Sequence, residues 1–207
     1  MKARAIKAVF WSALEQFGNK LVGFIISTML ARLLMPEEFG LIAMLSIFIG
    51  LASVLIDSGL TQSLIRTNEC DTEDLSTVFY FNIIISIIVY FIFYLIAPFV
   101  STYFEQPALI NIIRVYSIVF IINSFSAVQK TILTKSLDFK TLMFATMPSL
   151  FLYGLVGIFL AINGFGVWSL VWAAIAQSIA VSIQLWLKST FKPILIFNIV
   201  KFKYHFN

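Results

Sequence analysis

Ionisable and amide side chains recur along one side of an otherwise apolar segment near the amino terminus. At about 100° per residue, an α-helix would gather six small or polar residues into a stripe roughly 120° wide, bordered by Lys20. These six are Ser12, Glu15, Gln16, Asn19, Gly23 and Ser27. A charge near the centre of a membrane-spanning helix costs about 2.5–3.5 kcal/mol, so this face predicts a wet cavity or a helix interface. The alternative is that Glu15 and Lys20 lie near the inner interface and reach water there.

A second apolar segment places Ser46, Gly50, Ser53 and Asp57 on one helical face. Small residues at this spacing predict close packing against another helix. Asp57 is followed by Ser58 and a glycine that could end the helix. Its carboxylate therefore either satisfies backbone groups near a helix end or has a functional role within the membrane.

Arg114 lies near Asn111 and Ser117 in a later apolar segment, toward its outer side. Two interpretations stay open: the guanidinium reaches outward to the interface, or it points inward as an anion ligand. In three other segments, small and amide residues share a face and predict helix packing. They are Asn82 and Ser86, then Gly154, Gly157 and Ala161, and then Ala173, Gln177, Ala180 and Gln184.

The elements that carry these residues must cross a membrane. Of the 207 residues, 60% are hydrophobic and only 12% are charged, and the mean hydropathy is +0.98. Soluble domains carry roughly 25% charged residues, so this composition excludes a soluble enzyme and a disordered protein. Cys70 is the only cysteine and His205 the only histidine, so we expect neither an internal disulfide nor a metal site, and no cofactor motif is present.

Apolar runs and turn residues predict an all-α integral membrane protein with six spans. The predicted spans cover residues 8–34, 39–60, 77–97, 109–128, 142–162 and 167–187. Pro98 is expected to close the third span and Pro148 to kink the fifth. Residues 1–187 are thus predicted to form one six-helix bundle, and residues 188–207 a basic amphipathic segment or linker at the cytoplasmic face.

The distribution of the 14 Lys and Arg residues predicts the orientation. Arg32 and Arg114 fall toward one face and Lys20 within a span, whereas the other eleven fall on the opposite face. These eleven are Lys2, Arg4, Lys7, Arg66, Lys130, Lys135, Lys140, Lys188, Lys192, Lys201 and Lys203. By the positive-inside rule, both termini are expected to be cytoplasmic in a multi-pass protein of the cell (inner) membrane, and the net charge of +4 is not a nucleic-acid footprint.

Three stretches of the chain resemble one family of exporters. Residues 30–40 read LARLLMPEEFG, similar to the "LARLLGPEEFG" signature between the first two helices of Wzx-type polysaccharide flippases, with Met35 in place of the usual glycine. Residues 57–60 and 64–66 read DSGL and LIR, and residues 164–170 read GFGVWSL, similar to two further patterns of that family. The resemblance is to the branch that exports lipopolysaccharide and teichuronic acid, within the multidrug/oligosaccharidyl-lipid/polysaccharide exporter superfamily.

The resemblance implies the fold, the activity and the residues that carry them. Family members have two related bundles around a central cavity, and this chain corresponds to the amino-terminal bundle. Alternating access would move a polyprenyl-pyrophosphate-linked oligosaccharide between leaflets with no covalent step, so no enzymatic activity is expected. Cavity roles fall to Lys20, Arg114, Asn19 and Gln16, and ion coupling to Glu15 or Asp57. The motif residues with structural roles are Arg32, Pro36, Gly40, Gly59 and Arg66.

Three alternatives stay open beside this expectation. A drug/cation antiporter of the same superfamily would depend on a carboxylate such as Asp57 more than on Lys20. A membrane enzyme that modifies lipids would release a covalent product, although no catalytic constellation favours one. A non-transporting half would expose Glu15 and Lys20 to lipid, so it should pair with a second half-bundle or with its own copy. The expected partners are therefore membrane lipids, a lipid-linked substrate and one such bundle.

Overall fold

The regular elements of the described chain are all α-helices. The structure is a computed structural model that describes residues 2–56, 63–65 and 70–194. Its helices are α1 (Lys2–Leu33), α2 (Pro36–Ile56), α4 (Thr72–Tyr103), α5 (Ala108–Tyr116), α6 (Ile118–Lys135), α7 (Phe139–Ile162) and α8 (Val167–Lys188). The predicted all-α architecture is confirmed.

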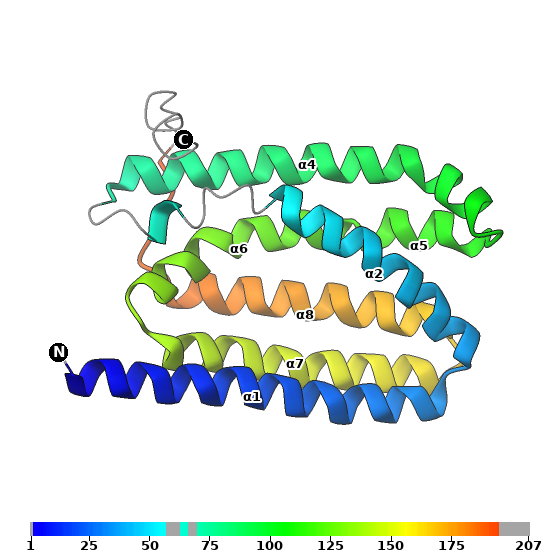
Figure 1. The fold of residues 1–207 in the computed structure, drawn as a ribbon, viewed down its shortest axis with the longest axis horizontal. Coiled ribbons are helices and arrows are strands. Elements are labelled where there is room, and N and C mark those ends of the chain that lie inside the picture. The colour runs from blue at the N-terminus through cyan, green and yellow to red at the C-terminus, as the bar shows by residue number, and fades with distance from the viewer. Residues whose placement is uncertain (1, 57–62, 66–69, 195–207) are drawn as a thin grey trace.

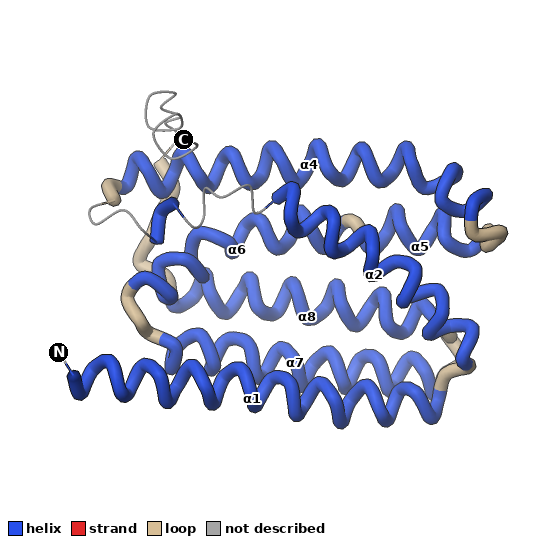
Figure 2. The backbone as a smooth tube through the Cα atoms, in the orientation of Figure 1, coloured by secondary structure: helices blue, strands red, loops and turns tan. Residues whose placement is uncertain are grey.

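The helices lie roughly parallel in a flattened bundle (Figures 1 and 2). Helix α1 packs along α7, α7 along α8, and α8 along α6, while α4 packs against α5 and α6 at the opposite edge. Helix α2 crosses this layer obliquely and contacts α4, α5 and α8. The amino-terminal edge of the bundle is therefore formed by α1, with α7 as its neighbour.

Five segments of the described chain are long and apolar enough to cross a membrane. They are Pro36–Val54, Thr72–Tyr103, Ala108–Lys135, Phe139–Ile162 and Val167–Lys188. This confirms an integral membrane protein and the last five predicted spans. Helix α1 is 32 residues long, about 48 Å at 1.5 Å per residue, but its polar face keeps it out of this apolar set. Its crossing of the membrane stays a prediction.

Two of the predicted span ends differ from the structure. Pro98 does not end the third span, because α4 runs through it to Tyr103. The helix ends instead where Glu105 adopts a φ of 55° and the Gln106 N–H bonds to the Ser101 carbonyl at 3.0 Å. Proline is tolerated within spanning helices because its neighbours can satisfy the freed backbone groups.

The fourth span is interrupted at Ser117, between α5 and α6. The Ser117 hydroxyl donates to the Ile113 carbonyl at 2.6 Å, one turn back. Such bonds compete with the helical ladder and bend helices. The span then continues to Lys135, seven residues beyond the predicted end at Val128.

The first residues after α8 pack back on the bundle. Phe191 is buried and its ring lies 6.3 Å from that of Phe79 on α4. The Ile194 N–H donates to the Ser76 hydroxyl at 3.0 Å. The start of the predicted linker is thus fixed to α4, and the prediction for residues 195–207 falls outside the described chain.

Glycines on α7 let α1 and α8 approach closely, as their spacing predicted. A Cβ built on Gly154 would lie 2.9 Å from Ile26, and one on Gly157 would lie 3.4 Å from both Leu30 and Ala173. The predicted packing role of Gly154 and Gly157 is confirmed. The shared seam also fixes α1, and hence its polar face, relative to the bundle.

We expect Gly154→Val to lower the melting temperature of the purified protein in detergent, because the added side chain must displace Ile26. Overpacking of this kind costs about 1–3 kcal/mol. Gly50→Val is the matched control, since nothing lies within 4 Å of a Cβ built there. Equal melting temperatures for the two variants would contradict the packing of α1 on α7.

Candidate functional site

The polar face of α1 is partly held by α7 and partly left open. Asn19 Nδ2 donates to Glu15 Oε1 at 3.0 Å and to Thr146 Oγ1 on α7 at 3.3 Å. Asn19 Oδ1 is buried without a hydrogen-bond partner in the described chain. Asn19 therefore links Glu15 on its own helix to Thr146, which lies 127 residues away in the sequence.

The rest of this face is open. Gln16, Lys20 and Ser27 are exposed, and no atom lies within 4 Å of a Cβ built on Gly23. Among the described residues, Gln16 Nε2 donates within its own helix, to Ser12 Oγ at 3.2 Å. We call Gln16, Lys20, Gly23 and Ser27 the open polar face. An ammonium and an amide exposed on an apolar bundle are costly when they face hydrocarbon.

Helix α2 carries a similar unpacked row. Ser46, Gly50 and Ser53 are exposed, and the two hydroxyls donate to carbonyls of their own helix, those of Ala43 and Ile49. The packing predicted at Gly50 is not formed within the described chain, because open space surrounds it. Two helices thus present small polar residues that this bundle does not cover, and Asp57 lies outside the described residues.

Arg114 lies across an aromatic ring on a neighbouring helix. Its guanidinium carbon is 4.1 Å from the ring centroid of Tyr94 on α4, and its Nε is buried without a hydrogen-bond partner in the described chain. A cation–π contact of this kind contributes about 0.5–2 kcal/mol. Since α1 packs along α7 and α5 against α4, the structure does not bring Arg114 and Lys20 together at one contact (Figure 1).

A polar cleft between α2, α6 and α8 was not predicted. It has a volume of about 350 Å³ and is lined by Ser53, Asn123, Ser126 and Lys130, among apolar residues. Nearby on α6, Gln129 is 1% exposed, and neither amide atom has a hydrogen-bond partner in the described chain. The predicted span ends at Val128, one residue before Gln129, whereas α6 continues to Lys135.

Asn82 and Ser86 occupy the packed interface that their spacing predicted. Both are buried on α4, and Ser86 Oγ donates to Ser124 Oγ on α6 at 3.1 Å. On α8, Gln184 Nε2 similarly donates to Ser149 Oγ on α7 at 2.9 Å. Interhelical hydrogen bonds from small polar residues stabilise membrane bundles, so these positions have a structural role.

Two of the sequence signatures meet at one end of the bundle. Pro36 is the first residue of α2, where its missing N–H costs nothing. Glu38 Oε2 accepts from the Met35 N–H at 2.9 Å, and its carboxylate lies against Gly166, in the turn between α7 and α8. The PEEFG and GFGVWSL signatures are therefore parts of one contact.

The remaining motif residues are only partly described. Arg32 is exposed in the last turn of α1, and Gly40 is half-buried in α2. Gly59 and Arg66 lie outside the described residues. Within the described ranges, no group of three or more His, Cys, Asp or Glu side chains could hold a metal ion.

The chain is similar in sequence to several known proteins of polysaccharide biosynthesis. The chain is 25% identical over 191 residues to the succinoglycan biosynthesis transport protein ExoT of Rhizobium meliloti, covering 92% of this chain and 39% of that protein. It is 25% identical over 140 residues to the lipopolysaccharide biosynthesis protein WzxC of Escherichia coli, covering 68% and 28%. A third match is the teichuronic acid biosynthesis protein TuaB of Bacillus subtilis, 25% identical over 91 residues, covering 44% and 19%.

The chain thus spans less than half the length of these relatives. No solved structure matches it significantly. The family profile described as "Polysaccharide biosynthesis protein" matches residues 29–207, which include α2 to α8 and the end of α1. With its all-helical membrane bundle and the paired signatures, the chain belongs to this polysaccharide biosynthesis protein family.

Proposed function

We propose that this bundle is one half of a flippase that carries a polyprenyl-pyrophosphate-linked oligosaccharide across the cytoplasmic membrane by alternating access. The observation that carries the proposal is the open polar face of α1, at the edge of a bundle that exposes many large apolar side chains. One relative is named a succinoglycan biosynthesis transport protein and another a lipopolysaccharide biosynthesis protein, which supports a carrier role.

The open polar face needs a second body to cover it. Lys20 and Gln16 are exposed, and charges that face lipid are expensive. A second bundle, supplied by further chain or by another copy, would enclose a wet cavity between the two faces. Residues 1–187 would then be one rocking unit, and residues 188–207 the cytoplasmic connection.

Within such a cavity, the exposed side chains would contact the substrate first. The Lys20 ammonium would attract the pyrophosphate, and the Gln16 amide could hydrogen-bond to sugar hydroxyls. Asn19 already bonds to Glu15 and Thr146, so an ion that binds at Glu15 would alter the contact between α1 and α7. This is the proposed route for ion coupling, and Asp57 is the other carboxylate that could take this role. Arg114 is proposed as a second cationic ligand of the pyrophosphate.

A deletion strain tests the proposed function. We expect surface polysaccharide to be lost when the gene is removed and restored by the gene on a plasmid. Failure of Lys20→Ala to restore it would favour phosphate recognition, whereas failure of Asp57→Asn together with restoration by Lys20→Ala would favour a cation antiporter. Normal surface polysaccharide in the deletion strain, with no second exporter gene present, would contradict the proposal.

A further inference from the structure

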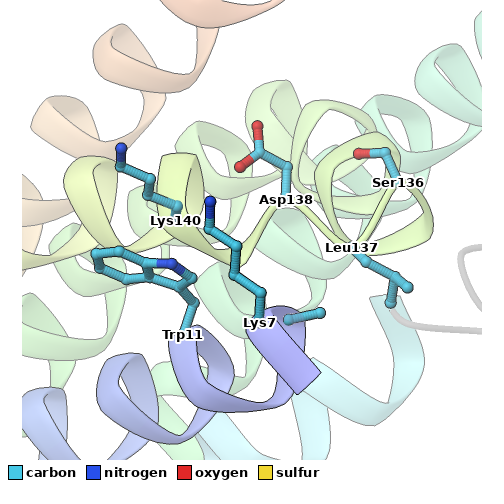
Figure 3. A pocket seen from close by; sticks show the side chains of 7 residues that line it. Lys7, Trp11, Ser136, Leu137, Asp138 and Lys140 are labelled. Atoms are coloured by element: carbon cyan, nitrogen blue, oxygen red, sulfur yellow. The ribbon is translucent and has the colours of Figure 1, made fainter. Parts of the chain in front are cut away.

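A cavity with two lysines lies at one end of the bundle, between the start of α1 and the turn before α7. It has a volume of about 400 Å³ and is lined by Lys7, Ala8 and Trp11 of α1 and by Ser136, Leu137, Asp138 and Lys140 around the start of α7. Figure 3 shows the Lys7 and Lys140 side chains extending to the same side from the two elements. We call these seven residues the lysine pocket.

The charge of the lysine pocket suits a single phosphodiester. Among the described residues that line it, Asp138 is the only carboxylate, and its oxygens accept from the Thr141 N–H at 3.1 Å and the Thr141 hydroxyl at 2.7 Å. That carboxylate caps α7. Two ammonium groups and one carboxylate leave a net charge of about +1, which matches one phosphodiester better than a pyrophosphate.

Aromatic rings lie beside the lysines of the pocket, as is common at a membrane surface. Lys140 Nζ lies 5.7 Å from the Trp11 ring centroid, and the Trp11 and Phe144 centroids are 6.5 Å apart. Lys188 Nζ, on the last turn of α8, lies 5.8 Å from the Phe144 ring. Tryptophan and lysine at the ends of spanning helices are typical of the headgroup level.

An apolar groove adjoins the lysine pocket. It has a volume of about 600 Å³, shares Ala8 and Leu137 with the pocket, and is lined mainly by apolar side chains. The other lining residues are Val9, Ser12, Ala13, Gln16, Phe17 and Phe139. A cationic pocket beside an apolar groove is complementary to a lipid, with its phosphate in the pocket and one chain in the groove.

We infer that the lysine pocket and its groove bind an anionic glycerophospholipid of the bilayer through its phosphodiester. The ligand is a resident membrane lipid, in the leaflet that the distribution of Lys and Arg predicts to be cytoplasmic. The lysine pocket does not include the proposed pyrophosphate ligand Lys20, although the adjoining groove reaches Gln16 of the open polar face. Lipid binding here does not depend on translocation.

Native mass spectrometry of the full chain in a neutral detergent tests the inference. We expect phosphatidylglycerol to bind more tightly than phosphatidylcholine with the same acyl chains, and Lys7→Gln/Lys140→Gln to weaken phosphatidylglycerol binding by about tenfold or more. The control Lys130→Gln/Lys192→Gln removes two exposed charges elsewhere and should leave binding within about twofold.

Further variants separate the pocket from the groove. Lys7→Arg/Lys140→Arg should retain binding because the charge is kept, whereas Ala13→Phe should weaken it by filling the groove. Equal loss in the site and control double variants would overturn the inference. Tighter binding of a polyprenyl pyrophosphate than of phosphatidylglycerol would overturn the assignment to a resident lipid, and equally strong competition by inorganic phosphate would overturn the role of the groove.

Discussion

Replacing Lys20 by alanine is expected to reduce surface polysaccharide by about tenfold or more in a strain where this protein is the only exporter. A hydrogen bond to a charged group contributes about 1.5–3 kcal/mol, which corresponds to a factor of about 10 to 100 in binding. Lys20 is exposed on the open polar face, so its loss should remove little packing within the bundle. The measurement is surface polysaccharide per cell, at matched amounts of membrane-inserted protein.

Two companion variants separate the charge of Lys20 from its bulk. Lys20→Arg keeps the charge and should retain most of the export. Leu21→Ala removes a large side chain from the next position on α1, where Leu21 is 63% exposed, and should export normally. Normal export by Lys20→Ala, or an equal defect in Leu21→Ala, would show that the Lys20 ammonium is not a substrate ligand.

The second large effect is expected at Gly166, where two sequence signatures meet. Gly166 has a φ of 56° and a ψ of −134°, a conformation that costs other residues about 1–3 kcal/mol. A Cβ at this position would also overlap the Glu38 carboxylate. Gly166→Ala should therefore lower the melting temperature in detergent by several degrees, since 1 kcal/mol corresponds to about 2–4 °C for a protein of this size.

Gly164 provides the control for backbone strain alone. It also has a positive φ, of 77°, but nothing lies within 4 Å of a Cβ built there. Gly164→Ala should therefore cost less than Gly166→Ala, and adding Glu38→Ala should recover part of the loss at Gly166. If Glu38→Ala gives no recovery, the α2 signature does not contact the turn before α8.

Much of the helical layout could be predicted because it follows from local properties of the chain. Apolar runs located the five spans, and the glycines at 164 and 166 marked the turn between α7 and α8. Pro98 was misread because a spanning helix can continue through proline when its surroundings satisfy the backbone. The end of α4 depends instead on the local turn at Glu105.

The candidate site was less predictable because it depends on contacts between distant segments. The polar face of α1 follows from helical periodicity, but its division into a held part and an open part depends on Thr146 of α7. The buried amide of Gln129 was missed because α6 runs past the end of the apolar run. The lysine pocket depends on the turn at Leu137 meeting the start of α1, which no local pattern indicates.

The most direct test of the proposed function is the leaflet in which lipid-linked repeat units accumulate when the gene is deleted. Spheroplasts from the deletion strain would be treated with an impermeant glycosidase before and after lysis. The flippase proposal predicts that the units are protected until lysis, since they would remain on the cytoplasmic leaflet. Accumulated units that the glycosidase cleaves in intact spheroplasts would contradict it, because translocation would then proceed without this protein.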